Sequence, residues 1–299
     1  MTPELANLRE QIDHAIDTHL PTHSNIAQAI TDGMRHAVLG GGKRLRPLLV
    51  CATSDALGGN MQQAFPVACA IEFIHAYSLI HDDLPAMDDD DMRHGLPSTH
   101  IKFGEANAIL AGDSLHSLAF QTIAAAPNFT AETRLQMIQL LAESAGWEGM
   151  AGGQCFDIAA EGKSLNLSEL QTLHAAKTGA LIRVSVQLGC LCAGENDAGD
   201  KHFSEAQFSL LSEFGDRIGL AFQVMDDVLD VTQSSDTLGK PAGSDEALAK
   251  STFPKLMGTS QARDLANTLV EEARALLEQS HLETSLLDTL AKLVVNRDH

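Results

Sequence analysis

The strongest structural signal in the chain is the stretch His81-Asp82-Asp83-Leu84-Pro85-Ala86-Met87-Asp88-Asp89-Asp90-Asp91, which follows an apolar run at residues 67–80. A second aspartate cluster, Asp226-Asp227-Val228-Leu229-Asp230, follows another apolar run at residues 218–225. Apolar residues recur at helical spacing along nearly the whole chain, and strand-like alternation between Asn-Gly or Asp-Gly turns is missing. We therefore expect one all-α domain over residues 1–299, with both clusters beside buried helix faces.

The spacing within each cluster indicates carboxylates that share a cation. On a helix, Asp226 and Asp230 differ by about 40° and lie one turn apart, so both can point to one side. Asp82 and Asp88 would diverge by about 120° on an ideal helix. Because Pro85 disrupts a helix, we expect a bulge or helix exit there that brings Asp88 back toward Asp82. The alternative for each cluster is a solvated acidic helix end, but carboxylates beside an apolar face repel each other and are costly to desolvate.

The ligand types indicate which cation these clusters bind. Hard oxygen ligands without a set of Cys or His favour Mg²⁺ over zinc. Because Mg²⁺ usually bridges one or two carboxylates to substrate phosphates, the sequence predicts a Mg²⁺ cofactor that joins protein carboxylates to a phosphate substrate.

The charge balance and the cysteines exclude several classes of protein. The chain has 40 acidic and 20 basic residues, a formal charge of −20, which argues against nucleic acid or an anionic membrane as a partner. It has no uncharged apolar run of about 18 residues, and residues 1–12 do not resemble a secretory signal, so we expect no membrane span. The five scattered cysteines lack a Cys-x-x-Cys motif. They indicate free buried thiols and a cytoplasmic location.

Lys and Arg are scarce, so their positions are informative. Residues 40–47, Gly-Gly-Gly-Lys-Arg-Leu-Arg-Pro, put a flexible glycine turn beside three cations at an expected helix start. Exposed N–H groups and the helix dipole suit an anion there, although the segment is neither a Walker loop nor a dinucleotide-binding fingerprint. Further cations are Arg93, Lys177, Lys240 and Lys250. Cations beside metal-binding carboxylates predict a diphosphate substrate held partly by Lys and Arg and partly through Mg²⁺.

Five motifs resemble, in order, those of the trans-prenyltransferases, the polyprenyl synthetase family: Gly-Gly-Lys-Arg-Leu-Arg-Pro (41–47), Asp-Asp-x-x-x-x-Asp (82–88), Gly-Gly-Gln-x-x-Asp (152–157), Lys-Thr-Gly (177–179) and Asp-Asp-x-x-Asp (226–230). The resemblance covers nearly the whole chain, and residues 77–119 are most similar to bacterial members that make farnesyl diphosphate. It implies an all-α isoprenoid-synthase bundle, usually homodimeric, with the two aspartate motifs facing each other across a central cavity. It also implies that isopentenyl diphosphate extends dimethylallyl and then geranyl diphosphate, head to tail, to farnesyl diphosphate and pyrophosphate.

The resemblance further implies roles for individual residues. The expected Mg²⁺ ligands on the allylic diphosphate are Asp82, Asp88 and Asp226, supported by Asp83, Asp227 and Asp230. The same diphosphate is expected to contact Arg93, Lys177, Lys240 and Lys250. Isopentenyl diphosphate is expected to contact Gly42, Lys43, Arg46 and His75. The residues implied beside the developing carbocation are Thr178 and Gln223. The strongest catalytic contributions are expected from Asp82, Asp88, Asp226, Lys177 and Arg93.

Product length and one departure from the family pattern concern a few further residues. Tyr77 and Ser78 lie about one helical turn before Asp82. In the family this level limits chain length, and an aromatic residue there fits a fifteen-carbon product. Without the resemblance, Tyr77 would be interpreted as a core tyrosine with a satisfied hydroxyl and His75 as a buried structural histidine.

The family usually has Arg-Arg-Gly where this chain has Arg93-His94-Gly95. The second position commonly binds isopentenyl diphosphate, so a neutral His94 is expected to weaken that site or make it pH-dependent.

Three other functions compete with this interpretation. A sibling enzyme that makes geranylgeranyl diphosphate, or another short-chain product, differs mainly at Tyr77 and Ser78. A class I terpene cyclase would not need the isopentenyl site around Lys43 and Arg46. A non-catalytic regulatory subunit or acidic cation-binding protein would not need both aspartate clusters and the cationic residues intact.

Overall fold

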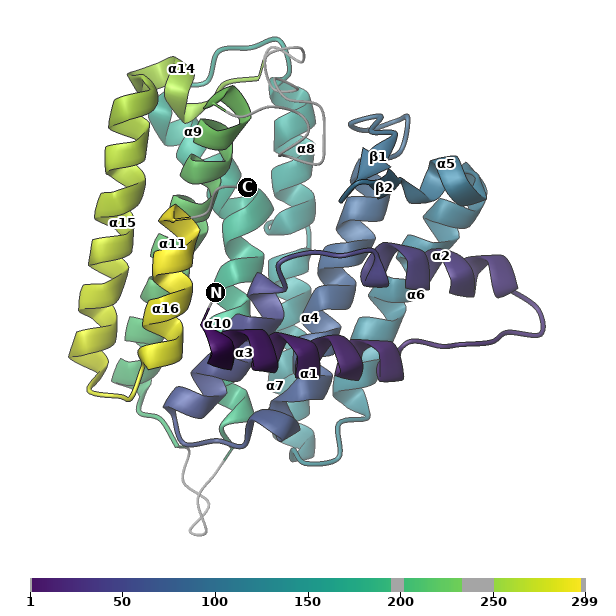
Figure 1. The fold of residues 1–299 in the computed structure, drawn as a ribbon, viewed down its shortest axis with the longest axis horizontal. Helices are drawn as coiled ribbons and strands as arrows, with labels where there is room; N and C mark the ends of the chain where they lie inside the picture. Colours follow the sequence, from purple (N-terminus) through teal and green to yellow (C-terminus); the bar gives the residue numbers. More distant parts are fainter. Residues whose placement is uncertain (1, 195–201, 233–249, 297–299) are drawn as a thin grey trace.

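A computed structural model describes residues 2–194, 202–232 and 250–296, and this part of the chain is almost entirely helical (Figure 1). The helices of the first half are α1 (Pro3–His19), α2 (Gln28–Leu39), α3 (Leu45–Ala56), α4 (Met61–Asp82), α5 (Thr99–Phe103), α6 (Glu105–Ala124) and α7 (Ala131–Ala145). Those of the second half are α8 (Met150–Ala160), α9 (Leu167–His174), η1 (Ala175–Gly179), α10 (Ala180–Cys192), α11 (Glu205–Thr232), α14 (Phe253–Met257), α15 (Thr259–Ser280) and α16 (Ser285–Val295). The prediction of an all-α bundle is confirmed.

One short hairpin is an exception to the helical pattern. Strands β1 (Met92–Arg93) and β2 (Leu96–Pro97) pair antiparallel directly after the first aspartate cluster. The two-residue loop between them, His94-Gly95, has φ angles of 51° and 76°. Positive φ at both central positions is the requirement of a type I′ turn, for which glycine is well suited. Strands of two residues are too short to give a period-two pattern, which is why the sequence analysis missed them.

Helix α4 forms the centre of the core. It packs against α1, α3, α6 and α10, and Ile71, Phe73 and Ile74 have no exposed surface. The helix is apolar on nearly all sides, which fits its position among other helices (Figure 1). Among the described residues, α4 is the one helix long and apolar enough to cross a membrane, and 67% of its apolar window is buried inside the molecule. Such burial is that of the core helix of a soluble protein.

Helix α11 organises the other half of the bundle. It packs against α10, α15 and α16 and also contacts η1, α9 and α14. Its carboxyl end, which carries the second aspartate cluster, lies at the same end of the bundle as the exit of α4 (Figure 1). All five cysteines are free and four are buried, as the sequence predicts, but Cys155 is exposed, contrary to the expectation of a buried thiol.

Candidate functional site

The chain turns back on itself immediately after α4. The helix ends at Asp82, and the Asp88 N–H donates a hydrogen bond of 2.8 Å to the Asp82 carbonyl oxygen. The prediction that Asp88 returns toward Asp82 is therefore confirmed, although the helix ends three residues before Pro85. A proline disfavours helical conformation in the residue before it, so helices commonly end ahead of it.

Asp82 and Asp88 form an acidic pair at the exit of α4. Burial raises the pKa of Asp82 to about 6, Lys177 opposes the rise, and the Asp88 charge adds to it. Oδ1 of Asp88 is buried without a hydrogen-bond donor among the described residues, and Lys250 Nζ lies 3.6 Å away. A divalent cation would favour the charged form of both carboxylates, so these oxygens fit a Mg²⁺ ligand set. Within the described residues, no three Asp, Glu, His or Cys side chains are already arranged around one metal position.

Asp83 has a different surrounding from its neighbour Asp82. Its side chain is 2% exposed, and its Oδ1 accepts hydrogen bonds from both Nε (3.0 Å) and Nη2 of Arg93. Asp90 Oδ2 accepts a second bond from Arg93 Nη2 at 3.2 Å. Asp83 and Asp90 thus anchor β1 beside the first cluster. The expected metal role of Asp83 and the expected diphosphate contact of Arg93 stay predictions.

A pair of lysines meets on Asp157, a residue that sequence reasoning did not assign to the site. Asp157 Oδ2 accepts hydrogen bonds from Lys177 Nζ at 2.6 Å and from Lys250 Nζ at 3.1 Å. Burial acts to raise the pKa of Asp157, but the two ammonium groups together hold it below its usual range. The pair brings two positive charges beside Asp82 and Asp88. The only signal in the sequence was the aspartate that closes the Gly-Gly-Gln-x-x-Asp motif.

Two features of the backbone place Lys177 at this point. The run from α9 to α10 is interrupted by the π-helical segment η1, which contains Lys177, Thr178 and Gly179. Single π turns inside α-helices occur frequently at functional sites. Helix α8 approaches η1 so closely that a Cβ on Gly153 would lie 2.2 Å from the Lys177 backbone nitrogen. Glycine at 153 is therefore a packing requirement, and it explains the second glycine of the motif.

The second aspartate cluster continues from this segment. Thr178 Oγ1 donates to Gln223 Oε1 at 2.9 Å, and Gln223 Nε2 donates to Asp227 Oδ1 at 3.4 Å. The structure thus brings Thr178 and Gln223 together, as expected. Asp226 and Asp230 lie one turn apart on α11, and Asp230 is 4% exposed. Lys240, the remaining expected contact of the allylic diphosphate, lies outside the described residues.

The two arginines of the basic segment before α3 have different surroundings. Arg44 has a structural role, because its guanidinium donates hydrogen bonds to Asp13, Glu72 and the Val38 carbonyl oxygen at 2.7–2.8 Å. Arg46 is 8% exposed, and its Nε donates to no acceptor among the described residues. Its pKa is lowered by burial. A buried guanidinium with an unused donor fits an anion.

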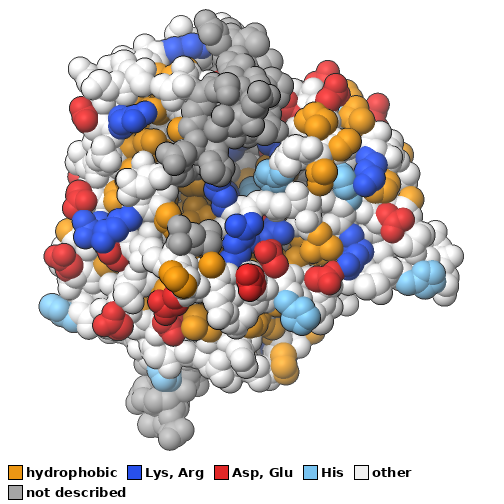
Figure 2. All heavy atoms as spheres, viewed as in Figure 1, with side chains coloured by type: hydrophobic (Ala, Val, Ile, Leu, Met, Phe, Trp, Pro, Cys, Tyr) orange, Lys and Arg blue, Asp and Glu red, His pale blue; other side chains and the backbone are white. Residues whose placement is uncertain are grey.

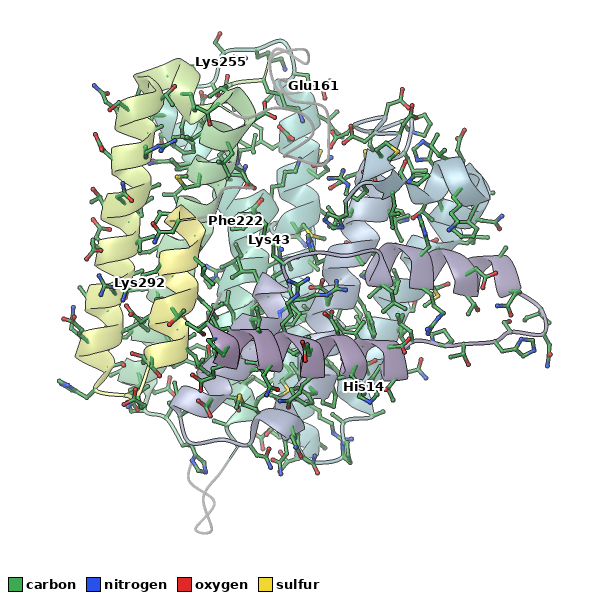
Figure 3. All side chains as sticks on the ribbon, in the orientation of Figure 1. His14, Lys43, Glu161, Phe222, Lys255 and Lys292 are labelled. Carbon is green, nitrogen blue, oxygen red and sulfur yellow. The ribbon has the colours of Figure 1, made fainter. Side chains whose placement is uncertain are left out.

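Several residues expected at the isopentenyl site lie near one another around this segment. Gly42 has a φ of 114°, and a Cβ placed there would lie 3.7 Å from Cε1 of His94. The pKa of His75 is lowered by burial and by the cations Arg46 and Arg93, with His94 adding to the effect. Lys43 is exposed on the loop before α3 and lies near the middle of the view in Figure 3. Gly42, Arg46, His75 and His94 are thus neighbours, as the sequence predicts.

A cavity of about 410 Å³ connects these groups. Its wall includes Arg46, His75, Tyr77, Ser78, Asp82, Gln154, Lys177 and Thr178. The same wall also contains apolar side chains, such as Met150 and Ile158. On the face shown in Figure 2, a group of Lys and Arg side chains lies near the centre among acidic ones. A wall that combines charged groups with apolar side chains suits an amphipathic ligand with an anionic head and a hydrocarbon tail.

The polyprenyl synthetase family model matches residues 27–286. The chain belongs to the polyprenyl synthetase family. It is 48% identical over 274 residues to the farnesyl diphosphate synthase of Escherichia coli (strain K12), covering 90% of this chain and 89% of that protein. It is also 43% identical over 273 residues to the chloroplastic geranylgeranyl pyrophosphate synthase of Catharanthus roseus, covering 90% of this chain and 74% of that protein.

A solved structure gives the same result for the fold. A geranyltransferase from Helicobacter pylori, complexed with magnesium and isoprenyl diphosphate, superposes with a TM-score of 0.84 at 33% identity, covering 99% of this chain and 97% of that one. This polyprenyl synthetase is therefore a prenyltransferase, its reaction is prenyl chain elongation, and its substrates are prenyl diphosphates. The predicted isoprenoid-synthase fold is confirmed.

Proposed function

We propose that this polyprenyl synthetase makes farnesyl diphosphate from dimethylallyl and geranyl diphosphates by successive additions of isopentenyl diphosphate, and that it does so with several bound Mg²⁺ ions. The observation that carries the proposal is that Lys177 and Lys250 meet beside Asp82 and Asp88, next to a cavity whose wall contains Asp82, Lys177 and Tyr77. The E. coli relative is named a farnesyl diphosphate synthase, which supports the fifteen-carbon product.

The allylic diphosphate is proposed to bind between the two aspartate clusters. Asp82, Asp88 and Asp226 hold the Mg²⁺ ions, with Asp83 and Asp230 in supporting positions. When bound, Mg²⁺ supplies positive charge that stabilises the departing pyrophosphate. Lys177 and Lys250 contribute to the same stabilisation, because Asp157 holds both ammonium groups in place before the substrate arrives. Arg93 and Lys240 complete the proposed diphosphate contacts.

Isopentenyl diphosphate is proposed to bind at the basic segment. Arg46 presents its unused Nε–H to the diphosphate, and Gly42, Lys43, His75 and His94 complete the site. Holding the double bond against the ionising carbon converts a bimolecular encounter into a positioned reaction. Thr178 and Gln223 present oxygen atoms toward the developing carbocation, and the apolar wall excludes water that would otherwise quench it.

The isopentenyl site gives a prediction about His94. Burial lowers the pKa of His94 below its ordinary value of 6.5, and Arg93, Arg44 and Lys43 lower it further. His94 is therefore neutral at pH 8, and we expect His94→Arg to lower the KM for isopentenyl diphosphate by about tenfold, the value of one charge-assisted hydrogen bond. As the pH falls below this lowered pKa the wild-type side chain gains its proton, so the difference between the two proteins narrows toward the acidic end of the range.

Steady-state kinetics from pH 5.5 to 8.5 test this prediction, with His94→Gln as a neutral control that matches wild type at pH 8. Equal KM values for wild type and His94→Arg at every pH would contradict it.

Product length is proposed to depend on Tyr77, with Ser78 at the same level. The Tyr77 ring lines the cavity and meets the His116 ring edge-on, with centroids 5.1 Å apart. Its half-buried phenol has a raised pKa because of burial and the nearby Asp82 charge. The His116 ring supports the uncharged Tyr77 ring, and the supported ring forms a floor that limits how far the growing chain can extend.

Removing this floor should lengthen the product. We expect Tyr77→Ala to shift the main product from fifteen to twenty carbons, because the space of the ring becomes available to a further isoprene unit. Tyr77→Phe keeps the ring volume and should keep the fifteen-carbon product. Chromatographic sizing of dephosphorylated products distinguishes the two. An unchanged fifteen-carbon product from Tyr77→Ala would show that the floor lies elsewhere.

A second candidate product is geranylgeranyl diphosphate, because the C. roseus relative is named for that activity. The decisive experiment incubates the purified chain with dimethylallyl and isopentenyl diphosphates and Mg²⁺ and sizes the products. Farnesyl diphosphate as the main product supports the proposal, twenty carbons supports the alternative, and no condensation removes both.

We also propose that the enzyme is a cytoplasmic homodimer without a membrane span. The supporting observation for the dimer is a group of exposed apolar side chains on α5 and α6, Ile101, Ile109 and Leu110, which are 43–52% exposed. Light scattering should give twice the mass of one chain, and the mass of a single chain would contradict the dimer.

A further inference from the structure

The middle aspartate of the second cluster contacts two other segments as well as a side chain of its own helix. Asp227 is 3% exposed. Its Oδ2 accepts a hydrogen bond from the Phe253 backbone N–H at 3.0 Å and lies 3.8 Å from His174 Nε2. Its Oδ1 accepts from Gln223 Nε2 at 3.4 Å. The carboxylate thus connects α11 to the start of α14 and to the end of α9.

The contact with His174 is packing and not an ion pair. Burial lowers the pKa of His174 to about 4, so the ring is neutral at pH 7. The ring stacks on Phe253 with centroids 5.6 Å apart and planes 24° apart. Asp227, His174 and Phe253 therefore form one compact unit in which the charge of Asp227 is stabilised by hydrogen-bond donors, chiefly the Phe253 N–H.

Phe253, the member of this unit on α14, lies three residues after Lys250 in the chain. Ser251 is fixed in the same way, because its Oγ accepts from the Leu165 N–H at 3.0 Å and lies 3.3 Å from the Lys163 carbonyl oxygen. Lys255 Nζ also donates to the Lys250 carbonyl oxygen at 2.8 Å. Figure 3 shows Lys255 on α14 and Glu161 at the end of α8 at the same end of the molecule. Residues 250–253 are therefore held against α11 and the connection between α8 and α9.

Neighbouring positions on α11 point in different directions. Asp226 and Asp227 differ by about 100° around the helix axis, and Asp226 is partly exposed whereas Asp227 is buried. Asp226 and Asp230, in contrast, differ by about 40° and share one side. The two adjacent aspartates thus have the geometry for two separate tasks.

We propose that Asp227 is a positioning residue that fixes the Thr252–Phe253 backbone and thereby sets where Lys250 Nζ meets Asp157 and Asp88. Asp226 keeps the proposed metal role, so the two aspartates act on the allylic diphosphate by different routes. The inference rests on the proposed diphosphate contact of Lys250. Replacement of Asp227 should then resemble replacement of Lys250 and should not resemble replacement of Asp226.

The test compares Asp227→Leu, Asp227→Asn, Lys250→Ala, the double variant D227L/K250A, and Asp226→Asn. For each protein, kcat and the KM for geranyl diphosphate are measured together with the Mg²⁺ concentration that gives half-maximal activity. Asp216→Asn is the matched control, because it removes an acid from α11 about three turns earlier, where Asp216 lies 3.8 Å from Arg183 and remote from the cavity. Circular dichroism confirms that each variant is folded.

The expected results separate the two tasks. Asp227→Leu and Lys250→Ala each lower kcat/KM for geranyl diphosphate tenfold or more. The kcat/KM of the double variant stays within threefold of that of the less active single variant, because the two residues act as a unit. Asp227→Asn keeps an oxygen acceptor for the Phe253 N–H, so it retains at least ten times the activity of Asp227→Leu at an unchanged Mg²⁺ requirement. Asp226→Asn raises that requirement severalfold.

Two results would overturn the inference. One is a rise in the Mg²⁺ requirement of Asp227→Asn equal to that of Asp226→Asn, which would make Asp227 a metal ligand. The other is multiplicative loss in D227L/K250A, which would make the two residues independent. If Lys250→Ala alone leaves kcat/KM for geranyl diphosphate unchanged, the proposed diphosphate role of Lys250 fails, and the positioning role fails with it. If Lys250→Ala is impaired but Asp227→Leu is not, only the positioning role fails.

Discussion

Replacement of Asp82 by Asn is expected to lower kcat by about 10²- to 10³-fold, the range found when one preorganised electrostatic contact to a developing charge is removed. Asn has the same shape, so the turn at the end of α4 and its hydrogen bond to Asp88 are kept. What is lost is the negative charge that, with Asp88, draws a divalent cation to the diphosphate. Single-turnover kinetics with saturating substrates and Mg²⁺ measure the chemical step directly.

The control for this variant lies in the same cluster. Asp89 is exposed and has a φ of 53°, a conformation that Asn tolerates well, so Asp89→Asn should stay within twofold of wild type. The wild-type enzyme should also need more Mg²⁺ as the pH falls below 6, because burial raises the pKa of Asp82 to about 6 and the metal must then displace a proton. Asp82→Asn with half or more of the wild-type kcat would contradict the assignment.

Gly153→Ala is expected to lower kcat about 10²-fold through a single added methyl group. The Cβ would lie 2.2 Å from the Lys177 backbone nitrogen and 2.5 Å from its Cα, so α8 and η1 must separate. Lys177 then leaves Asp157, Thr178 leaves Gln223, and displacements of about 1 Å in a reacting site can cost 10²-fold in rate. Because the contact is with backbone, rotation of a side chain cannot relieve it.

Ala159→Ser provides the comparison for Gly153→Ala, because Ala159 is an exposed position on the same helix. We expect that variant to keep wild-type kcat and thermal stability. Gly153→Ala should also lose stability, since overpacking typically costs about 1–3 kcal/mol. Wild-type kcat in a folded Gly153→Ala protein would show that the close approach of α8 to η1 is not needed for catalysis.

The sequence predicted those features that depend on short-range geometry. Pro85 indicated that the chain leaves its helix and returns Asp88 to Asp82, and the structure shows this return. The four-residue spacing of Asp226 and Asp230 placed both on one side of α11. Local rules suffice in these cases because the helix repeat and the covalent restriction of proline act over a few residues.

Features that depend on long-range contacts could not be predicted by such local rules. Asp157 meets one lysine 20 residues away and another 93 residues away, and no spacing rule connects such distant positions. The family resemblance assigned Arg46 and not Arg44 to the substrate, but only the fold shows that Arg44 is paired with Asp13 and Glu72. The π-helical segment at Lys177 packs against α8 and α11, which are also contacts that a local pattern does not predict.

The central claim is that both aspartate clusters bind one allylic diphosphate through Mg²⁺. Its most direct test is calorimetric titration with geranyl thiolodiphosphate, an analogue whose carbon–sulfur bond resists ionisation, in the presence and absence of Mg²⁺. We predict binding by the wild-type protein only with Mg²⁺, and affinity at least tenfold weaker in both Asp82→Asn and Asp226→Asn. Wild-type affinity in either variant, or equal affinity with and without Mg²⁺, would contradict the claim.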